Sequence, residues 1–233
     1  LKRLNTDYID LYWLHAWDFT TPIEEVMRAL DDMVRAGKVL YIGVSDTPAW
    51  VVSRANLLAE LRGWTPFVAL QIQYSLVDRT PERDLIPMAN ELDLAVTPWG
   101  ALGAGVLSGK YNLQKDVKGR ANLRGQVDNR KLRIAQEVIK ISKKLGVTPS
   151  QVALSWVRQQ PGIMIPILGA KTAEQLKDNL GCLEVTLGPK ELNRLDRISK
   201  IDLGFPHDFL SADIFRDIIF GGTYNKIDNH HRK

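Results

Sequence analysis

The chain contains very little cysteine and no long apolar run. Cys182 is the single cysteine among 233 residues, so no internal disulfide can form, as is typical of proteins in the reducing cytoplasm. No stretch approaches the roughly 20 apolar residues that a membrane helix needs, and no signal-peptide pattern opens the chain. The sequence therefore predicts a cytoplasmic protein without a membrane partner.

Clustered positive charge is missing as well. The net charge is +4 and the pI is near 9.1, but the basic residues are scattered and do not alternate with aromatic ones. Proteins that bind nucleic acid usually gather such residues into patches. We therefore expect no nucleic-acid partner, and an anionic small ligand fits this charge at least as well.

Two further absences concern the fold. No Gly-x-Gly-x-x-Gly turn follows any apolar run, which argues against a Rossmann domain. The chain also opens on Leu1 instead of methionine, and LKRLN resembles the end of a helix that began earlier. From this we expect the given chain to be a truncated form of a longer fold.

Short apolar runs that resemble buried strands alternate with helical patterns. The first four runs begin about 30 residues apart, a spacing typical of strand–helix units in a parallel sheet. A basic loop (110–131) and a helix (132–145) precede the fifth run as an insertion. The five predicted strands cover 8–15, 39–45, 67–75, 94–100 and 163–169.

This alternation predicts a TIM barrel, in which the functional site lies at the carboxyl ends of the strands. Only five of the eight strands that such a barrel needs are found. We expect residues 1–204 to form a partial barrel with the site, and residues 205–233 to form a carboxyl-terminal tail. The predicted strands end on polar or small residues: His15, Ser45-Asp46, Gln71 and Tyr74, Trp99-Gly100, and Gly169-Ala170-Lys171.

Five segments of the chain resemble a known family. DYIDLYWLH, GKVLYIGVSD, LQIQYSLVDR, PWGALGAGVLSGKY and PILGAKTAEQLKDNL occur in this order. Together they resemble the aldo-keto reductases, in particular the branch that includes the β subunits of voltage-gated potassium channels, from Leu1 to about Leu195. The resemblance implies an α/β (β/α)8 TIM barrel that lacks its first three strand–helix units, so that strands 4–8 are present.

The resemblance also implies an oxidoreductase that reduces aldehydes or ketones to alcohols with NADPH and without a metal. In the family a tyrosine, a histidine, an aspartate and a lysine are catalytic, and His15 matches the histidine. Its neutral imidazole N–H would polarise the substrate carbonyl as hydride arrives. The other three would precede Leu1, so we expect residues 1–233 alone not to turn over at an enzymatic rate. The alternative for His15 is a core histidine bonded to a backbone carbonyl.

Three residues match those that bind the nicotinamide carboxamide in the family, namely Ser45, Asp46 and Gln71. Hydroxyl and amide groups can fix a carboxamide, but the family usually has asparagine where this chain has Asp46, and a carboxylate can only accept. Helix capping is the alternative for Ser45 and Asp46. Trp99 matches an aromatic that stacks on the nicotinamide ring, and core packing is its alternative.

The remaining matches would hold the phosphates and the adenosine. Glycines after Trp99 would let backbone amides approach a pyrophosphate. Lys171, beside a helix start with a Thr172–Gln175 capping-box pattern, would meet the 2′-phosphate of NADP. A basic surface loop and an ordinary surface helix are the alternatives. The predicted set is Gly100, Ala101, Leu102, Gly103, Gly105, Lys110, Arg120, Gly169, Lys171, Gln175, Asp178 and Asn179.

Two classes of function stay open. One is an NADPH-dependent reductase of a small-molecule carbonyl substrate, with a possible homo-oligomer. The other is an NADP(H)-binding regulatory subunit like the channel β subunits, and an inactive truncated product is a third possibility. Cys182 is expected to pack as a small hydrophobic residue, and His230-His231 to form no metal site.

Overall fold

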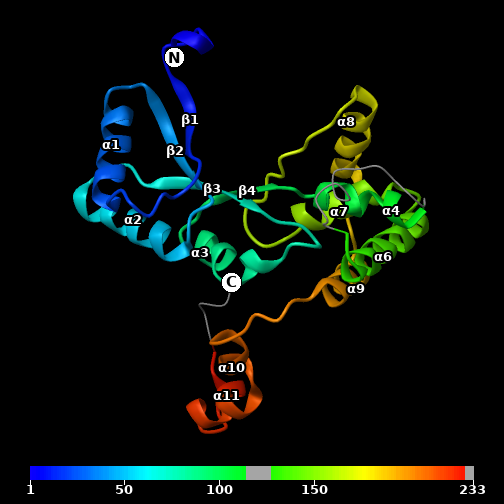
Figure 1. Ribbon diagram of the computed structural model, residues 1–233. Helices are drawn as coiled ribbons and strands as arrows, with labels where there is room; N and C mark the ends of the chain where they lie inside the picture. Colours follow the sequence, from blue (N-terminus) through cyan, green and yellow to red (C-terminus); the bar gives the residue numbers. More distant parts are fainter. Residues whose placement is uncertain (114–126, 229–233) are drawn as a thin grey trace. The chain divides into compact units, whose positions relative to one another are not determined.

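The computed structural model describes residues 1–113 and 127–228, which divide into the units Leu1–Lys200 and Ile201–Lys233. A four-stranded parallel sheet organises the first unit (Figure 1). Its strands are adjacent in space in the order of the sequence: β1 (Ile9–Leu14), β2 (Val39–Ser45), β3 (Phe67–Gln73) and β4 (Ala95–Trp99). The predicted parallel α/β arrangement is confirmed for these strands.

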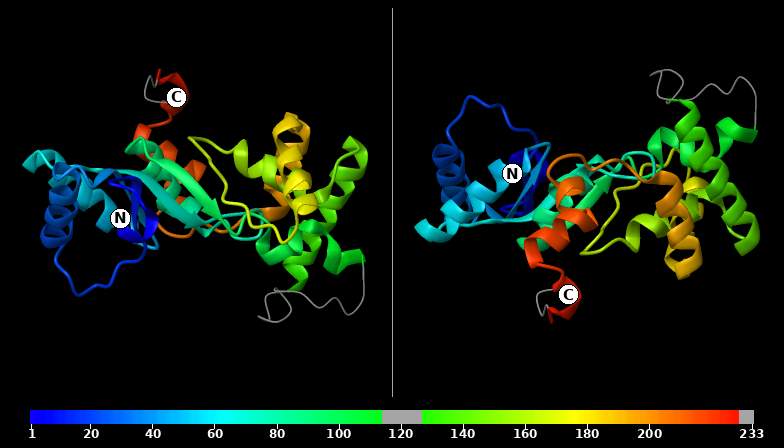
Figure 2. Two further views of the ribbon diagram at one scale, coloured as in Figure 1. Left: turned by 90° about the horizontal axis from the view of Figure 1, so that it is seen from above. Right: turned by 90° about the horizontal axis from the view of Figure 1, so that it is seen from below.

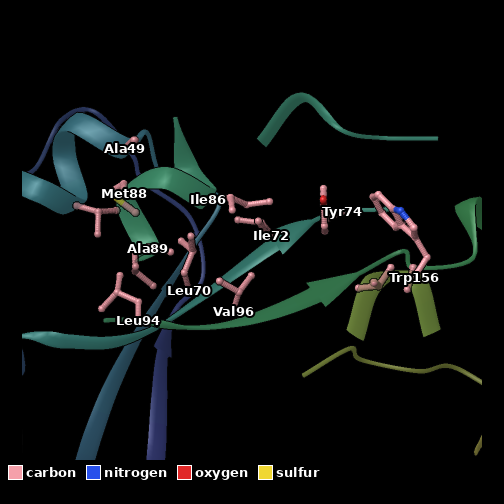
Figure 3. Packing of buried hydrophobic residues seen from close by; sticks show 14 of the residues in the cluster. Ala49, Leu70, Ile72, Tyr74, Ile86, Met88, Ala89, Leu94, Val96 and Trp156 are labelled. Atoms are coloured by element: carbon pink, nitrogen blue, oxygen red, sulfur yellow. The ribbon is translucent and has the colours of Figure 1, made fainter. Parts of the chain in front are cut away.

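A short 3-10 helix, η1 (Lys2–Leu4), precedes β1. The helices between the strands are α1 (Ile23–Arg35), α2 (Ala49–Arg62) and α3 (Leu85–Glu91), with the short 3-10 helix η2 (Thr80–Arg83) before α3. They pack on one face of the sheet, where apolar residues of the inner strands are fully buried. Figure 3 shows Leu70, Ile72 and Val96 of the strands beside Ile86, Met88 and Ala89 of α3. Burial of these apolar side chains away from water therefore holds this face of the sheet against the helices.

The predicted fifth strand, residues 163–169, is not a strand in the structure. It forms one isolated parallel bridge, Met164 with Val96. Three backbone hydrogen bonds of 2.8 Å still follow β4, from Val96 N to Ile163 O, from Ile165 N to Val96 O, and from Ile167 N to Pro98 O. Pro98 has no N–H to donate back, so the ladder is interrupted at the next position.

The second half of the first unit is helical. After the loop helices η3 (Gly103–Ser108) and α4 (Lys110–Leu113), the helices are α6 (Asn129–Leu145), α7 (Pro149–Arg158), α8 (Ala173–Leu180), η4 (Gly181–Glu184) and α9 (Pro189–Ser199). Figure 2 shows α6 to α9 gathered together, in agreement with their mutual contacts. The insertion helix begins earlier than predicted because Asp128 caps it, accepting from Lys131 N at 2.8 Å.

The second unit contains α10 (His207–Ser211), α11 (Asp213–Phe220) and η5 (Tyr224–Lys226), where the sequence predicted a tail with one short helix at most. Within residues 1–113 and 127–228, none of the helices has the length and apolar character needed to cross a membrane.

A buried polar network that the sequence did not reveal ties η2 to α9. Arg79 donates to both oxygens of Glu82 at 2.7 and 2.9 Å, and to Asp196 Oδ1 at 3.2 Å. Its guanidinium also lies 5.0 Å from the ring centroid of Trp156. Tyr74 donates to Glu82 Oε1 at 2.6 Å, and burial together with this bond raises the pKa of its hydroxyl. Tyr74 thus belongs to the core and not to the polar ends of the strands.

Candidate functional site

Several predicted site residues meet at the carboxyl edge of the sheet. In the parallel register Leu14 pairs with Val44, Ser45 with Gln71, and Gln73 with Trp99. His15 follows the last residue of β1 and is exposed, which does not fit the alternative of a buried core histidine. The parallel direction of the strands brings these side chains to one edge from positions far apart in the sequence.

Ser45, at this edge, has a buried hydroxyl group that is available for hydrogen bonding. It is 1% exposed, and its Oγ has no hydrogen-bond partner within the described part of the chain. Helix capping does not explain it, because the N-cap of α2 is Pro48 and makes no side-chain cap bond. A buried hydroxyl without a partner costs free energy, so Ser45 offers a donor and an acceptor to a ligand.

Asp46 and Trp99 line a hollow of about 230 Å³ together with Gln73. Asp46 has φ 41°, the left-handed conformation that aspartate tolerates better than most residues. The N–H of Trp17 donates to its carbonyl at 3.4 Å, which joins the loop after His15 to the end of β2. The Trp99 ring is 36% exposed, so core packing alone does not account for it.

The glycine-rich segment after Trp99 makes a tight left-handed turn. Gly103, Ala104 and Gly105 all have positive φ, at 55°, 52° and 91°, and a Cβ on Gly103 would lie 2.6 Å from Val77 Cγ2. The N–H groups of Gly103 and Gly105 donate within the turn, to Gly100 O at 2.7 Å and Leu102 O at 2.9 Å. These two glycines therefore serve the turn, with their amides already bonded.

A cavity of about 520 Å³ opens beside this turn. Its wall brings together the turn, the segment after residue 166 and α8, which are distant in the sequence. Of the predicted residues it is lined by Gly100, Ala101, Leu102, Gly105, Lys110, Gly169, Lys171, Gln175, Asp178 and Asn179. Gly103 is outside this lining, and Arg120 lies outside the described residues. The lining of the hollow includes Trp99 and the lining of the cavity begins at Gly100, the next residue in the chain.

The start of α8 faces the cavity with a fixed backbone. Thr172 caps the helix by accepting from Gln175 N at 3.3 Å. The reciprocal capping-box bond is absent, because Gln175 Oε1 accepts from Lys171 N at 3.0 Å and not from Thr172 N. This bond holds the backbone of Lys171 at the helix N-terminus, where partial positive charge favours anions.

Two of the three charged side chains lining the cavity are cations. Lys110 lies against Gly105, where a Cβ would come within 3.2 Å of Lys110 Nζ, and Lys171 lines the cavity at the start of α8. The third is Asp178, whose Oδ2 accepts from Thr148 Oγ1 and whose Oδ1 accepts from Gln151 Nε2, each at 3.2 Å. Neutral donors thus occupy both carboxylate oxygens, and the cavity is suited to an anion.

Sequence reasoning missed several lining residues, among them Ser108, Ser150 and Ile167. Ser150 follows the proline that opens α7, so the capping-box pattern could have indicated that it lies at a helix start. No residue near Ser150 in the sequence indicates that Ser150 lines a cavity, because α7 and α8 come together only in the folded chain.

The structure combines a parallel α/β sheet that has a polar carboxyl edge with a lysine-lined cavity at a glycine turn and a helix N-terminus, an arrangement typical of α/β proteins that bind small ligands. The family model described as "Aldo/keto reductase family" matches residues 1–200. The chain belongs to the aldo/keto reductase family.

Named relatives agree with this assignment. Norsolorinic acid reductase of Aspergillus flavus is 37% identical over 210 residues, which cover 90% of this chain and 53% of that protein. Norsolorinic acid reductase B of Dothistroma septosporum is 38% identical, covering 92% and 55%. "Probable aryl-alcohol dehydrogenase AAD4" of Saccharomyces cerevisiae is 36% identical, covering 91% and 67%. The chain thus spans about half the length of the two norsolorinic acid reductases.

Proposed function

We propose that this protein binds NADPH and acts in the reduction of an aldehyde or ketone to an alcohol. The observation that carries the proposal is the buried hydroxyl of Ser45, which has no partner among the described residues, at a polar strand edge whose next residue after Trp99 lines a cavity with two lysines. One end suits a carboxamide and the other suits phosphates, which are the two ends of a nicotinamide dinucleotide. In this proposal β1 to β4 are the fourth to seventh strands of the family barrel, and residues 163–169 are the eighth.

The residues of the strand edge would hold the nicotinamide. The hydroxyl of Ser45 and the amide of Gln71 can both donate and accept, and Asp46 can accept from the carboxamide NH₂. Trp99, half-exposed at the end of β4, offers a ring face to stack on. When bound, the reduced nicotinamide supplies a hydride.

His15 would act on the substrate. It is exposed at the same edge as Ser45, and a neutral imidazole N–H there can donate to a carbonyl oxygen on which negative charge develops. The name of one relative contains aryl alcohols, so we propose an aryl carbonyl compound as the substrate. A cytoplasmic location, a homo-oligomer and membership of the branch with the channel β subunits stay predictions.

The phosphate end distinguishes NADP from NAD. Lys171 at the start of α8 would meet the 2′-phosphate, and Lys110 adds a second cation to the lining of the cavity. A full charge on a helix N-terminus strengthens binding of a phosphate through charge-assisted hydrogen bonds. NADH lacks the 2′-phosphate and would lose this contact.

The test is the substitution Lys171→Ala, measured by titrating tryptophan fluorescence with NADPH and with NADH. We expect the preference for NADPH to fall by about 1.5–3 kcal/mol, the contribution of a hydrogen bond to a charged group, while NADH affinity stays near its original value. Lys143→Ala, in the last turn of α6 and away from the cavity lining, is the control. Equal affinity of the unaltered protein for both cofactors would contradict the assignment.

A further inference from the structure

One face of α7 carries a stripe of polar side chains at helical spacing. Thr148, Gln151, Ser155 and Arg158 recur at intervals of three or four residues, so they lie on the same side of the helix. All four side chains donate hydrogen bonds to the end of α8 and the residues just after it. Thr148 and Gln151 donate to Asp178, and Ser155 and Arg158 donate to the carbonyl of Cys182. The stripe thus fastens the end of α8 and the start of η4 to α7.

The end of the stripe nearer the cavity is organised around Gln151. Its Nε2 donates to Asp178 O at 2.8 Å and to Asp178 Oδ1 at 3.2 Å, while its Oε1 accepts from Thr148 N at 3.2 Å. Thr148 Oγ1 donates to the other oxygen of the Asp178 carboxylate at 3.2 Å. A Cβ on Gly181 would collide with Gln151 Nε2, so the chain after α8 passes directly over this amide.

The far end of α7 makes bonds of the same kind away from the cavity. Gln159 Nε2 donates to Leu187 O at 3.0 Å, and its Oε1 accepts from Leu187 N at 2.8 Å. Neither Gln159 nor Leu187 lines the cavity. The helix therefore offers two glutamines with matched bonding, of which one holds a wall of the cavity and the other does not.

The helix α8, which forms this wall of the cavity, depends on contacts with other elements for its stability. The helix α8 has eight residues, and helices this short are marginal in water without tertiary contacts. Three of its residues line the cavity, and Asn179 among them is 5% exposed. Its last turn is fixed through Asp178, because Gln151 takes both the backbone carbonyl and the carboxylate of that residue.

We propose that Gln151, together with Thr148, is a positioning residue of the cofactor site. It does not line the cavity; it fixes the last turn of α8 so that Asp178 and Asn179 face the ligand, and it keeps the Asp178 carboxylate bonded to neutral donors beside Lys110 and Lys171. This inference rests on the proposed binding of NADPH. The start of α7 would then contribute to the affinity for NADPH, in addition to capping its own helix.

The experiment compares Gln151→Met with Gln159→Met in the full chain. Thermal unfolding gives the stability of each variant, and fluorescence titration with NADPH, well below both midpoints, gives Kd. We expect similar losses of stability, since each variant loses a bidentate amide. Gln151→Met should raise Kd about tenfold, the size of one or two lost hydrogen bonds, while Gln159→Met should leave it within about twofold, inside the spread of independent sites.

A third variant separates positioning from helix capping. Gln151→Glu keeps an acceptor for Thr148 N, so the capping box survives, but it cannot donate to Asp178 and places a like charge beside it. We expect it to weaken NADPH binding at least as much as Gln151→Met. Equal Kd values for the Gln151 and Gln159 variants, whether unchanged or equally raised, would overturn the positioning role. No binding of NADPH by the unaltered protein would overturn the proposed function and this inference with it.

Discussion

Replacing Ser45 by alanine should change stability and NADPH affinity in opposite directions. The side chain is 1% exposed at the end of β2, and its hydroxyl has no partner within the described residues. Alanine removes the hydroxyl and leaves the backbone unchanged. The ligand-free protein therefore loses a polar group that folding desolvates without compensation, and the bound protein loses a contact.

The magnitudes follow from this burial. A buried polar group without a partner costs about 1–3 kcal/mol, so its removal should stabilise the folded protein by that amount. The small void left by one oxygen loses packing contacts and offsets about 1 kcal/mol of this stabilisation. A net stabilisation of about 1 kcal/mol would raise the melting temperature of a chain of this size by about 2–4 °C. Loss of one neutral hydrogen bond to a carboxamide, about 0.5–1.5 kcal/mol, would raise Kd for NADPH about 2- to 12-fold.

The assay pairs thermal unfolding without cofactor with fluorescence titration by NADPH. Ser199→Ala is the matched control, because Ser199 is fully buried and away from the cavity lining, but its Oγ accepts from Arg79 Nη1 at 2.7 Å and donates to Leu195 O at 2.6 Å. That variant should be less stable by at least about 1 kcal/mol, the usual net contribution of one hydrogen bond, with Kd unchanged. A lower melting temperature and an unchanged Kd in Ser45→Ala would refute the view that Ser45 is held ready for a ligand.

Three further predictions concern other parts of the chain. If Trp99 stacks on the nicotinamide, NADPH should quench part of the fluorescence of the six tryptophans, and Trp99→Leu should lose that component; an unchanged quench would assign Trp99 to packing. Arg79→Met should destabilise the protein by about 1.5–3 kcal/mol in urea unfolding, because the partly buried Glu82 carboxylate loses its charge-assisted hydrogen bonds; a loss below 1 kcal/mol would contradict this. Burial alone would raise the pKa of Asp31, but the hydrogen bonds from the Arg35 guanidinium and from Thr65 outweigh burial and lower that pKa. The ionised Asp31 therefore stabilises the folded protein above the unfolded pKa of about 4, and this stabilisation is lost as the pH falls through the lower folded pKa. Asp31→Asn should therefore be less stable at pH 7 and lose part of the acid dependence, and identical pH–stability curves would refute this.

Much of the first half of the fold was present in the sequence as local pattern. The predicted strand 39–45 agrees with β2 residue for residue. The capping box with which Thr148 and Gln151 begin α7 is a local pattern of the same kind. Apolar spacing and cap residues act between neighbours in the chain, so a reader of the sequence can locate them. The residues predicted to hold the phosphates and the adenosine came instead from the family resemblance, and most of them line one cavity in the structure.

Other features were decided by residues distant in the sequence. Residues 163–169 have the composition of a strand, yet Pro98 in the neighbouring strand interrupts their ladder. Gln175 resembles a capping residue, but its acceptor is used by Lys171 N. Tyr74 stands near a strand end with the polar residues, but its hydroxyl binds Glu82 in the core.

The sequence alone determined most of the strands and helices of the first unit, which residues carry charge and hydrogen-bonding groups, and the family to which they are similar. Only the tertiary structure decided which of those groups are already satisfied and which are left for a ligand. Ser45 and Ser155 are both buried serines with the same chemistry, and packing gives a carbonyl to one and nothing to the other. A hydrogen bond depends on where the second group lies in space, and between distant segments only the folded chain sets that position.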